Sequence, residues 1–236
     1  MRTYKILGLL LTYPEANWLE HCDELRSTLR EEGKLSSDSM RRVEKLIDGL
    51  VDAELLDLQE RYCDTFDRGR SHCLNLFEHV YGESRDRGQA MAELLELYMA
   101  KGLESTGAEL PDYLPLYLEY LSRLDPVTAR DSLSDTVEVI AVIEARLRQS
   151  ESPYAAAMAA LVELSKKKIN KKEIEEAAAN TPDDRSFEAI DAAWEEAEAF
   201  GGKPDTPCPT SAQAGSNLSS QPQPINFVAN ARGSQA

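Results

Sequence analysis

Residues 131–150, DSLSDTVEVIAVIEARLRQS, carry apolar side chains at the spacing of an α-helix. The apolar positions of this segment are Leu133, Val137, Val139, Ile140, Ile143 and Leu147. Side chains three and four residues apart share one face of a helix, so the pattern predicts a long helix with one face in a core. The same spacing recurs at Met91, Leu94, Leu95 and Tyr98.

Helical spacing extends outward from this segment through most of the chain. Glycine and proline are sparse before residue 200, and the alternation typical of β-strands is nearly absent. Helices are predicted at about 3–12, 15–31, 37–50, 52–67, 85–101, 111–124, 131–150, 153–168, 170–179 and 186–200. We therefore predict an all-α fold, a single compact helical-bundle domain of roughly nine or ten helices.

The end of the chain has a different composition. Residues 201–236 are rich in Gly, Pro, Ser, Gln and Asn, and such a segment buries too little apolar surface to offset the entropy lost on ordering. We predict a helical domain at 1–200 and a disordered tail at 201–236. The acidic helix at 186–200 fits either docking on the bundle, which we favour, or a mobile flap that covers a groove.

The charge of the chain narrows the classes of partner. Its 236 residues include 42 acids and 26 bases, a formal net charge of −16. Such a surface repels nucleic acids and anionic membranes and attracts basic partners. The one basic cluster, KKKINKK at 166–172, is interpreted as a solvated helix end. We expect a protein that binds no nucleic acid.

The cysteines and the first residues indicate a compartment. Cys22, Cys63, Cys73 and Cys208 form no C-x-x-C pair. The apolar opening YKILGLLLTYP, residues 4–14, is too short for a membrane anchor or an export signal. We expect a cytoplasmic protein that does not itself insert into a membrane.

The stretch FDRGRSHCLNLFEHVYGESRDRGQAM, residues 66–91, concentrates polar side chains. The triplet Asp-Arg-Gly occurs in it twice, and His72, Cys73 and His79 lie between the copies. Metal sites, phosphate loops and nucleophilic triads need fixed spacings that this stretch lacks. We expect no metal site, no catalytic residues and therefore no enzyme.

The doubled triplet fits two helix ends. Gly69 is predicted to end a helix in the left-handed conformation. Ser84 or Asp86 is predicted to cap the next helix, with Gln89 returning a bond. Because arginine–carboxylate pairs can fix two loops against each other, we assign loop bracing to Asp67, Arg68, Arg85 and Arg87.

The second informative stretch is ELPDYLPLYLEYLSRL, residues 109–124. Tyr113, Tyr117 and Tyr120 follow the helical spacing i, i+4, i+7, with leucines beside them. Two interpretations stay open. The segment is a central buried helix whose tyrosine hydroxyls find partners, or it is a groove wall that offers aromatic faces to an apolar peptide.

Both stretches closely resemble the family of respiratory nitrate reductase delta subunits, which are molybdenum cofactor assembly chaperones. The likeness is strongest over about 60–124 and looser at LLLTYPEANW and DAAWEE. Residues 110–113 are similar to a Glu-Pro-x-Asp-His signature of the wider family, which is tied to signal-peptide binding. Tyr113 stands at the histidine position and Glu109 is displaced, while Tyr62 and Phe66 resemble an aromatic-x-x-Leu-Phe element with Thr65 in place of Leu.

The resemblance implies an all-helical chaperone with no catalytic turnover and no permanently bound cofactor. Its partner is then the N-terminal segment of the catalytic (alpha) subunit in the cofactor-free nitrate reductase, a remnant of a twin-arginine export signal. It implies that the chaperone holds this subunit back from the membrane until molybdopterin guanine dinucleotide is inserted. Molybdenum cofactor biosynthesis proteins are a further partner class.

We place the peptide-binding site on the two stretches together. The apolar face of the client is predicted to pack on Tyr113, Leu116, Tyr117 and Tyr120, with Phe77 and Met91 nearby. Carboxylates predicted to face its basic residues are Asp112, Glu119, Glu78 and Asp86. On this hypothesis the change Asp112→Asn weakens client binding by ~1 kcal/mol or more.

Two other functions compete with a chaperone. One is a permanent accessory or scaffold subunit of the membrane oxidoreductase. The other is a small helical hydrolase that depends on a metal or nucleotide and uses His72, His79 and Arg87.

Overall fold

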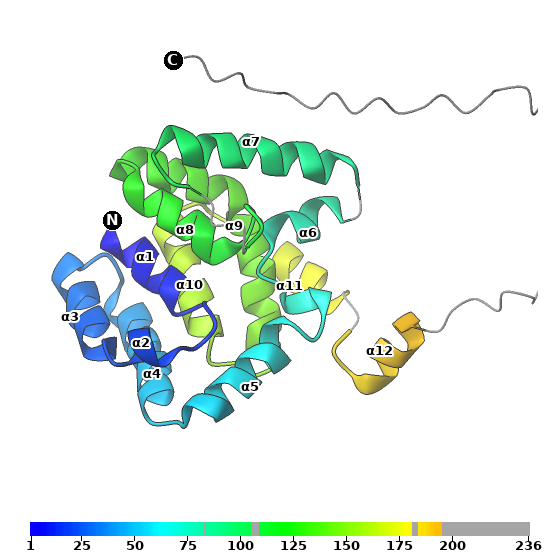
Figure 1. Cartoon of the computed structure of the whole chain (residues 1–236), viewed down its shortest axis with the longest axis horizontal. Coiled ribbons are helices and arrows are strands. Elements are labelled where there is room, and N and C mark those ends of the chain that lie inside the picture. Colours follow the sequence, from blue (N-terminus) through cyan, green and yellow to red (C-terminus); the bar gives the residue numbers. More distant parts are fainter. Residues whose placement is uncertain (83, 105–108, 181–183, 195–236) are drawn as a thin grey trace, which may run out of the picture. The chain divides into compact units, whose positions relative to one another are not determined.

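The computed structural model describes residues 1–82, 84–104, 109–180 and 184–194, which form helices joined by short loops (Figure 1). The helices are α1 (Arg2–Leu9), α2 (Ala16–Leu19), α3 (Cys22–Glu32), α4 (Ser37–Val51), α5 (Leu55–Phe66), α6 (Leu76–Tyr81), α7 (Asp86–Ala100), α8 (Leu114–Arg123), α9 (Pro126–Gln149), α10 (Ala155–Ser165), α11 (Lys171–Ala179) and α12 (Phe187–Trp194), with a 3₁₀ turn η1 (Arg70–His72). The described part contains no strand, so the predicted all-α class is confirmed. The tail predicted at 201–236 and the end of the helix predicted at 186–200 lie outside the described residues.

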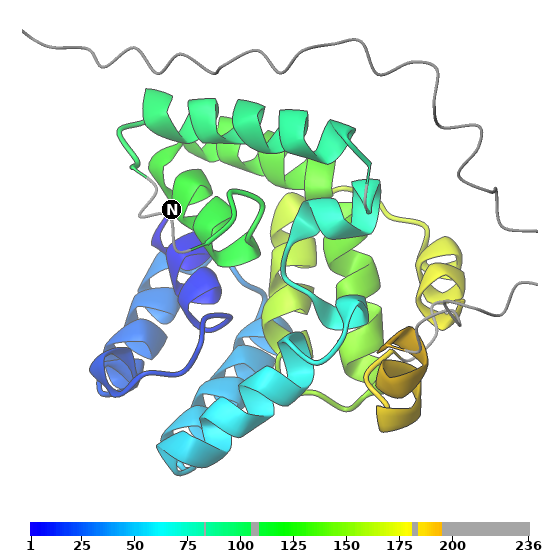
Figure 2. The ribbon, with the colours of Figure 1, turned by 45° about the vertical axis from the view of Figure 1, so that its right-hand side comes forward.

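The long helix α9 lies at the centre of the core. Five of its six predicted apolar positions are completely buried, and the sixth, Val139, is half-buried. Helix α10 packs along it, as the turned view in Figure 2 shows, and α8 and α11 also contact it. The helix begins five residues earlier than predicted, at Pro126. The side chain of Asp125 accepts hydrogen bonds from the amides of Val127 and Thr128, both at 3.1 Å, and so caps that end.

Helix α1 packs unusually close to α8. A Cβ atom on Gly8 would lie 3.2 Å from both the Leu118 Cβ and the Pro115 carbonyl oxygen, so glycine permits this approach. The amino group of Met1 donates to the carbonyl of Ser122 at 3.1 Å, which ties the start of α1 to the end of α8. The two helices therefore form a fixed pair.

The predicted helices differ from the structure at two further boundaries and in one missing helix. The helix predicted at 15–31 is two helices, because α2 is a single turn in which Trp18 is buried and its indole N–H donates to the Tyr13 carbonyl at 3.3 Å. Helix α8 begins at Leu114 rather than 111, which places Pro115 in the first turn, where a missing amide costs nothing. Helix α6 was not predicted.

The prediction for Gly69 was also wrong. Its φ of −152° and ψ of 166° are extended, and α5 ends before it at Phe66. Glycine is needed there for space instead, because a Cβ atom would lie 2.8 Å from the Asp184 Cγ. The reciprocal cap of α7 does not form either. The hydroxyl of Ser84 accepts from the Asp86 amide at 3.2 Å, but the Gln89 side chain donates to Glu93.

Candidate functional site

A cavity of about 430 Å³ lies between α1, α8 and the segment that leads into α8. We call it the apolar trough. Its lining residues are Lys5, Gly8, Leu9, Thr12, Leu103, Glu104, Glu109, Tyr113, Pro115, Leu116 and Glu119. Three leucines and one proline supply apolar side chains to the lining, and three glutamates stand among them.

The three glutamates of the trough differ in their partners. The Nζ atom of Lys5 lies 3.0 Å from the Glu119 Oε1, and Arg123 approaches the same oxygen at 3.9 Å. Glu104 and Glu109 are exposed, and among the described residues no ion pair involves either of them. The trough therefore carries negative charge that the basic residues in the described part of the chain do not neutralise.

A second cavity of about 420 Å³, the aromatic pocket, adjoins the trough. It is lined by Tyr13, Tyr62, Phe66, Asp67, Cys73, Leu74, Asn75, Glu109 and Tyr113. The ring of Tyr62 meets Tyr13 edge-on at 5.6 Å and Phe66 at 4.9 Å between centroids. Since Glu109 and Tyr113 line both cavities, the two cavities meet at these residues.

Two tyrosine hydroxyls form a chain at this junction. Tyr62 donates to the Leu11 carbonyl at 3.1 Å, and its oxygen lies 2.9 Å from the Tyr113 hydroxyl. Burial raises the pKa of Tyr113 to about 12 and the pKa of Tyr62 further still. Both hydroxyls therefore stay protonated at neutral pH.

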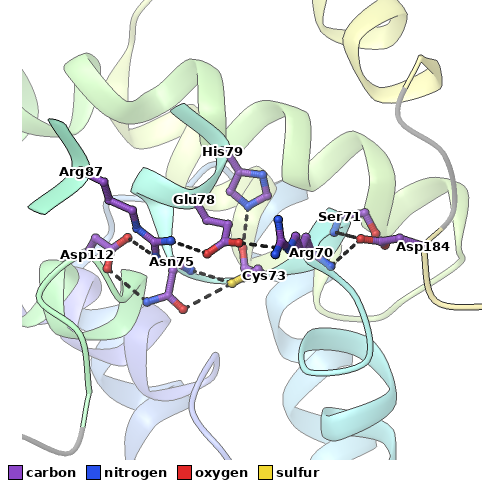
Figure 3. Close-up of polar contacts among 9 residues, drawn as sticks. All are labelled: Arg70, Ser71, Cys73, Asn75, Glu78, His79, Arg87, Asp112 and Asp184. Atoms are coloured by element: carbon purple, nitrogen blue, oxygen red, sulfur yellow. Dashed lines mark hydrogen bonds and ion pairs between the residues drawn. The ribbon is translucent and has the colours of Figure 1, made fainter. Parts of the chain in front are cut away.

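Behind the junction, Asp112 is the buried first member of a polar network (Figure 3). Its side chain has no exposed area. It accepts from the Asn75 side chain at 3.2 Å and from the Phe77 amide at 3.0 Å, and the Arg87 guanidinium lies 3.6 Å away. The hydrogen bond from the Phe77 amide gives one unpaired N–H of the first turn of α6 an acceptor. Asp112 therefore anchors α6 to the segment before α8.

The network continues from Arg87 to the last described residues. Arg87 donates to Glu78 at 2.7 Å, and the Nε of Arg70 lies 3.5 Å from the other Glu78 oxygen. The Asp184 carboxylate accepts from the backbone amides of Arg70 at 2.6 Å and Ser71 at 3.2 Å. Figure 3 shows this series, which we call the polar seam: Asp112, Asn75, Arg87, Glu78, Arg70, Ser71 and Asp184.

The histidines and Cys73 have structural partners. The Nε2 of His79 donates to the Cys73 carbonyl at 2.8 Å, and burial lowers its pKa. His72 is buried, with its Nδ1 at 3.1 Å from the Thr65 carbonyl. Burial raises the pKa of the Cys73 thiol. In the described ranges, no three His, Cys, Asp or Glu side chains are grouped to hold a metal ion.

The predicted client-facing residues in α8 and at its N-cap divide into two groups. Tyr113, Leu116 and Glu119 come together at the apolar trough. Tyr117 and Tyr120 are each only 6% exposed and belong to the core. The Tyr117 hydroxyl donates to the Ser132 carbonyl at 2.8 Å, and the Tyr120 ring packs on Tyr98. Tyr113 is the residue just before the first helical residue, Leu114, and of the three tyrosines it is the one that lines the trough.

The remaining predicted client contacts lie elsewhere. Asp112 was predicted to face the client, but full burial excludes direct contact in this structure. The Glu78 carboxylate forms ion pairs with Arg87 and Arg70. Phe77 and Met91 are half-buried and Asp86 is exposed, on α6 and α7, and none of the three lines the trough or the aromatic pocket.

Among the residues assigned to loop bracing, Arg87 joins three segments through Glu78 and Asp112. Arg68 pairs with Asp64 at 2.9 Å and lies over the Phe187 ring at 5.1 Å, so it contacts the last helix instead. Arg85 is exposed, and no ion pair involves it in the described segments. Asp67 is exposed and lines the aromatic pocket.

Leu9, Thr12, Tyr13 and Glu104 were missed as site residues. A signal for Leu9 exists, because Lys5 and Leu9 are four residues apart and so share one face of α1, while Thr12 lies just beyond the end of that helix. No helix in the described ranges combines the length and apolarity that crossing a membrane requires.

The chain matches the family model described as nitrate reductase delta subunit over residues 32–160. It is 40% identical, over 191 residues and 81% of both chains, to the nitrate reductase molybdenum cofactor assembly chaperone NarJ of Escherichia coli. It is 39% identical over 196 residues, 83% of this chain and 82% of the relative, to the probable chaperone NarW of the same organism. The probable NarJ chaperone of Bacillus subtilis is 29% identical over 157 residues, 65% of this chain and 82% of the relative.

Proposed function

Because this chain belongs to the nitrate reductase delta subunit family, we propose that it is a chaperone of molybdenum cofactor assembly in nitrate reductase. It binds the N-terminal segment of the catalytic (alpha) subunit in the cytoplasm, while that subunit still lacks its cofactor. It delays docking of the subunit on the membrane until molybdopterin guanine dinucleotide has been inserted. The cofactor goes to the client, and the chaperone itself performs no catalysis.

The observation that carries this proposal is the junction of the apolar trough with the aromatic pocket. An amphipathic peptide places apolar side chains at regular spacing on one face and charged side chains on the other. Leu9, Pro115 and Leu116 offer an apolar surface to the first face. Glu104 and Glu109 offer uncompensated negative charge to a basic flank, which favours encounter and sets orientation.

The polar seam has a supporting role in this proposal. Tyr113 stands next to Asp112, and its backbone pairs with Asn75 in an isolated antiparallel bridge. Asp112 is fixed in turn by Asn75, Phe77 and Arg87. We infer that the seam fixes the position of the junction, so that the trough is preformed and less ordering entropy is lost when the client binds.

Calorimetric titration with a peptide of the client's first ~20 residues tests binding at the trough. Leu116→Glu, which puts a charge on the apolar lining, is expected to lower affinity at least ~10-fold. The control is Leu56→Glu on α5, where the leucine is already 75% exposed and lines neither cavity. Equal affinities of the Leu116 variant, the control and the unaltered protein would remove the trough as the site.

Purification of the client separates a chaperone from a permanent accessory subunit. The chain is expected to co-purify with nitrate reductase from cells that cannot make the molybdenum cofactor. It is expected to be absent from the cofactor-loaded membrane enzyme. Recovery in equal proportion with both forms would favour the permanent subunit.

A further inference from the structure

The hydrogen bonds of Tyr62 and Tyr113 at the junction determine which of the two hydroxyls donates and which accepts. A tyrosine hydroxyl has one hydrogen to donate and two lone pairs to accept with. Tyr62 uses its hydrogen on the Leu11 carbonyl, so the 2.9 Å contact requires Tyr113 to donate to Tyr62. The Tyr113 oxygen then has only acceptor capacity left for anything that enters the cavities it lines.

Two of the other polar groups of this pocket can only accept hydrogen bonds. Asp67 and Glu109 are carboxylates, both exposed, and both line it. Among the described residues, no lysine or arginine lines the pocket and no ion pair joins either carboxylate to a basic residue. The trough differs here, because its Glu119 already has Lys5 at 3.0 Å. Uncompensated acceptors therefore gather at the aromatic pocket.

The walls of the pocket add a second requirement. Tyr13 is 43% exposed and stands edge-on to Tyr62, and Tyr113 is half-buried beside Glu109. Aromatic faces attract cations, and the planar guanidinium group stacks on them while its fork of N–H donors serves several acceptors. An ammonium group is a compact point charge and uses only part of such an environment.

We propose that the aromatic pocket binds one arginine side chain of the client segment, with its guanidinium between the Tyr113 oxygen and the Asp67 and Glu109 carboxylates. The neighbouring trough holds the apolar side chains that flank this arginine. This assignment rests on the proposed function and adds to it the chemical class of one client residue. It predicts a client segment in which a single arginine carries more of the affinity than any lysine.

A double-mutant cycle between peptide and protein tests the assignment. Each arginine of the client peptide is replaced in turn by citrulline, which keeps the shape and removes the charge, and separately by lysine. Each peptide is titrated into the unaltered protein and into the Glu109→Gln/Tyr113→Phe variant. This variant keeps the Tyr113 ring and leaves the Tyr62 bond to Leu11 in place. The matched control is Glu60→Gln/Tyr117→Phe, whose residues line neither cavity.

One citrulline substitution is expected to weaken binding to the unaltered protein and to the control about 10-fold, and lysine at that position about 3-fold. The same citrulline substitution is expected to cost the Glu109/Tyr113 variant less than about 2-fold. If the peptide binds but no arginine couples to this variant more than to the control, the pocket assignment is wrong and the proposed function stands. If lysine equals arginine, the guanidinium assignment is wrong. If the peptide does not bind the unaltered protein, both the pocket assignment and the proposed function are wrong. If the client peptide contains no arginine, only the pocket assignment is wrong.

Discussion

Asp112 and Glu109 lie three residues apart in the segment that leads into α8, and the structure places their carboxylates in opposite surroundings. Asp112 has no exposed area and is held by Asn75, Phe77 and Arg87 in the polar seam. Glu109 is exposed where the apolar trough meets the aromatic pocket, and no ion pair in the described segments involves it.

The difference between them separates stability from recognition. A buried carboxylate is tolerated only when donors and a counter-charge surround it, so Asp112 contributes to the position of α6, α7 and the junction. An exposed carboxylate loses little when it is removed, and it is free to meet a ligand. Two acids of similar appearance in the sequence therefore have opposite surroundings, and their removal should affect stability and client binding separately.

The largest effect is expected from Asp112→Ala. It removes the partners of Asn75 and the Phe77 amide and leaves Arg87 short of a counter-charge near the core. Breaking a buried pair on one side costs ~3–5 kcal/mol, so urea unfolding should show a loss of that size. Glu109→Ala should change the free energy of unfolding by less than ~0.5 kcal/mol. Similar losses for the two variants would break the comparison.

Asp112→Asn sharpens the same point. The amide keeps an oxygen for the Phe77 N–H but offers Arg87 no charge, so the loss in unfolding free energy should be smaller than for alanine, ~1–3 kcal/mol. Client affinity, measured where both proteins are folded, should fall only through displacement of the junction. Asp112→Asn was first expected to remove a direct client contact. A loss of affinity with no loss of stability would restore that hypothesis.

An intermediate effect is expected from Gly69→Ala at the far end of the seam. The new Cβ would lie 2.8 Å from the Asp184 Cγ, so the carboxylate must leave the Arg70 and Ser71 amides. Overpacking of this kind costs ~1–3 kcal/mol in unfolding free energy. Gly49→Ala in α4 is the control, because nothing lies within 4 Å of its added Cβ and alanine favours a helix. A neutral Gly69→Ala would show that Asp184 adds nothing to the seam.

A smaller, pH-dependent effect is expected at His79, which contacts the seam through Cys73. Burial lowers its pKa in the folded protein, so below the unfolded value of ~6.5 the unfolded chain binds the extra proton first. The contribution of His79 to stability is therefore complete above that pH and decreases as the pH falls toward the lowered folded pKa. Urea midpoints measured between pH 7.5 and 5.5 should fall less for His79→Gln than for the unaltered protein. Parallel curves would contradict this.

Long periodic helices could be predicted from the sequence, and short ones could not. The buried stripe of α9 and the bounds of α4, α7 and α11 follow local spacing and were found within one or two residues. Helix α6 has only six residues, and its first turn depends on the Asp112 carboxylate far along the chain. The break between α2 and α3 likewise follows burial of Trp18, a tertiary event. The spacing of apolar residues along the sequence indicates neither the contact of α6 with Asp112 nor the burial of Trp18.

The site could be predicted only where one helix supplies it. Leu116 and Glu119 lie three apart on α8 and were found together. The opposite wall comes from α1, about a hundred residues earlier, and only packing brings Leu9 to Leu116. Burial of Asp112 could not be predicted from the sequence either. Aspartate is rarely buried unless it has a partner, and only the fold brings Arg87 close to Asp112.

The smallest effect is expected at Glu119, which combines features of both carboxylates because it lines the trough but is paired with Lys5 at 3.0 Å. Its side chain is 35% exposed, so the pair contributes at most ~0.5 kcal/mol to stability. Glu119→Gln removes one negative charge and also frees the positive charge of Lys5, which repels a basic client. Client affinity should therefore fall about 2-fold at low salt, and the loss should disappear at high salt because exposed charges are screened.

The double variant Lys5→Gln/Glu119→Gln removes both charges and should bind the client as the unaltered protein does, whereas Glu109→Gln should stay impaired with Lys5 present or absent. If the double variant binds no better than Glu119→Gln alone, then Glu119 contacts the client directly despite its pairing, and exposure rather than a free charge decides which carboxylates recognise it.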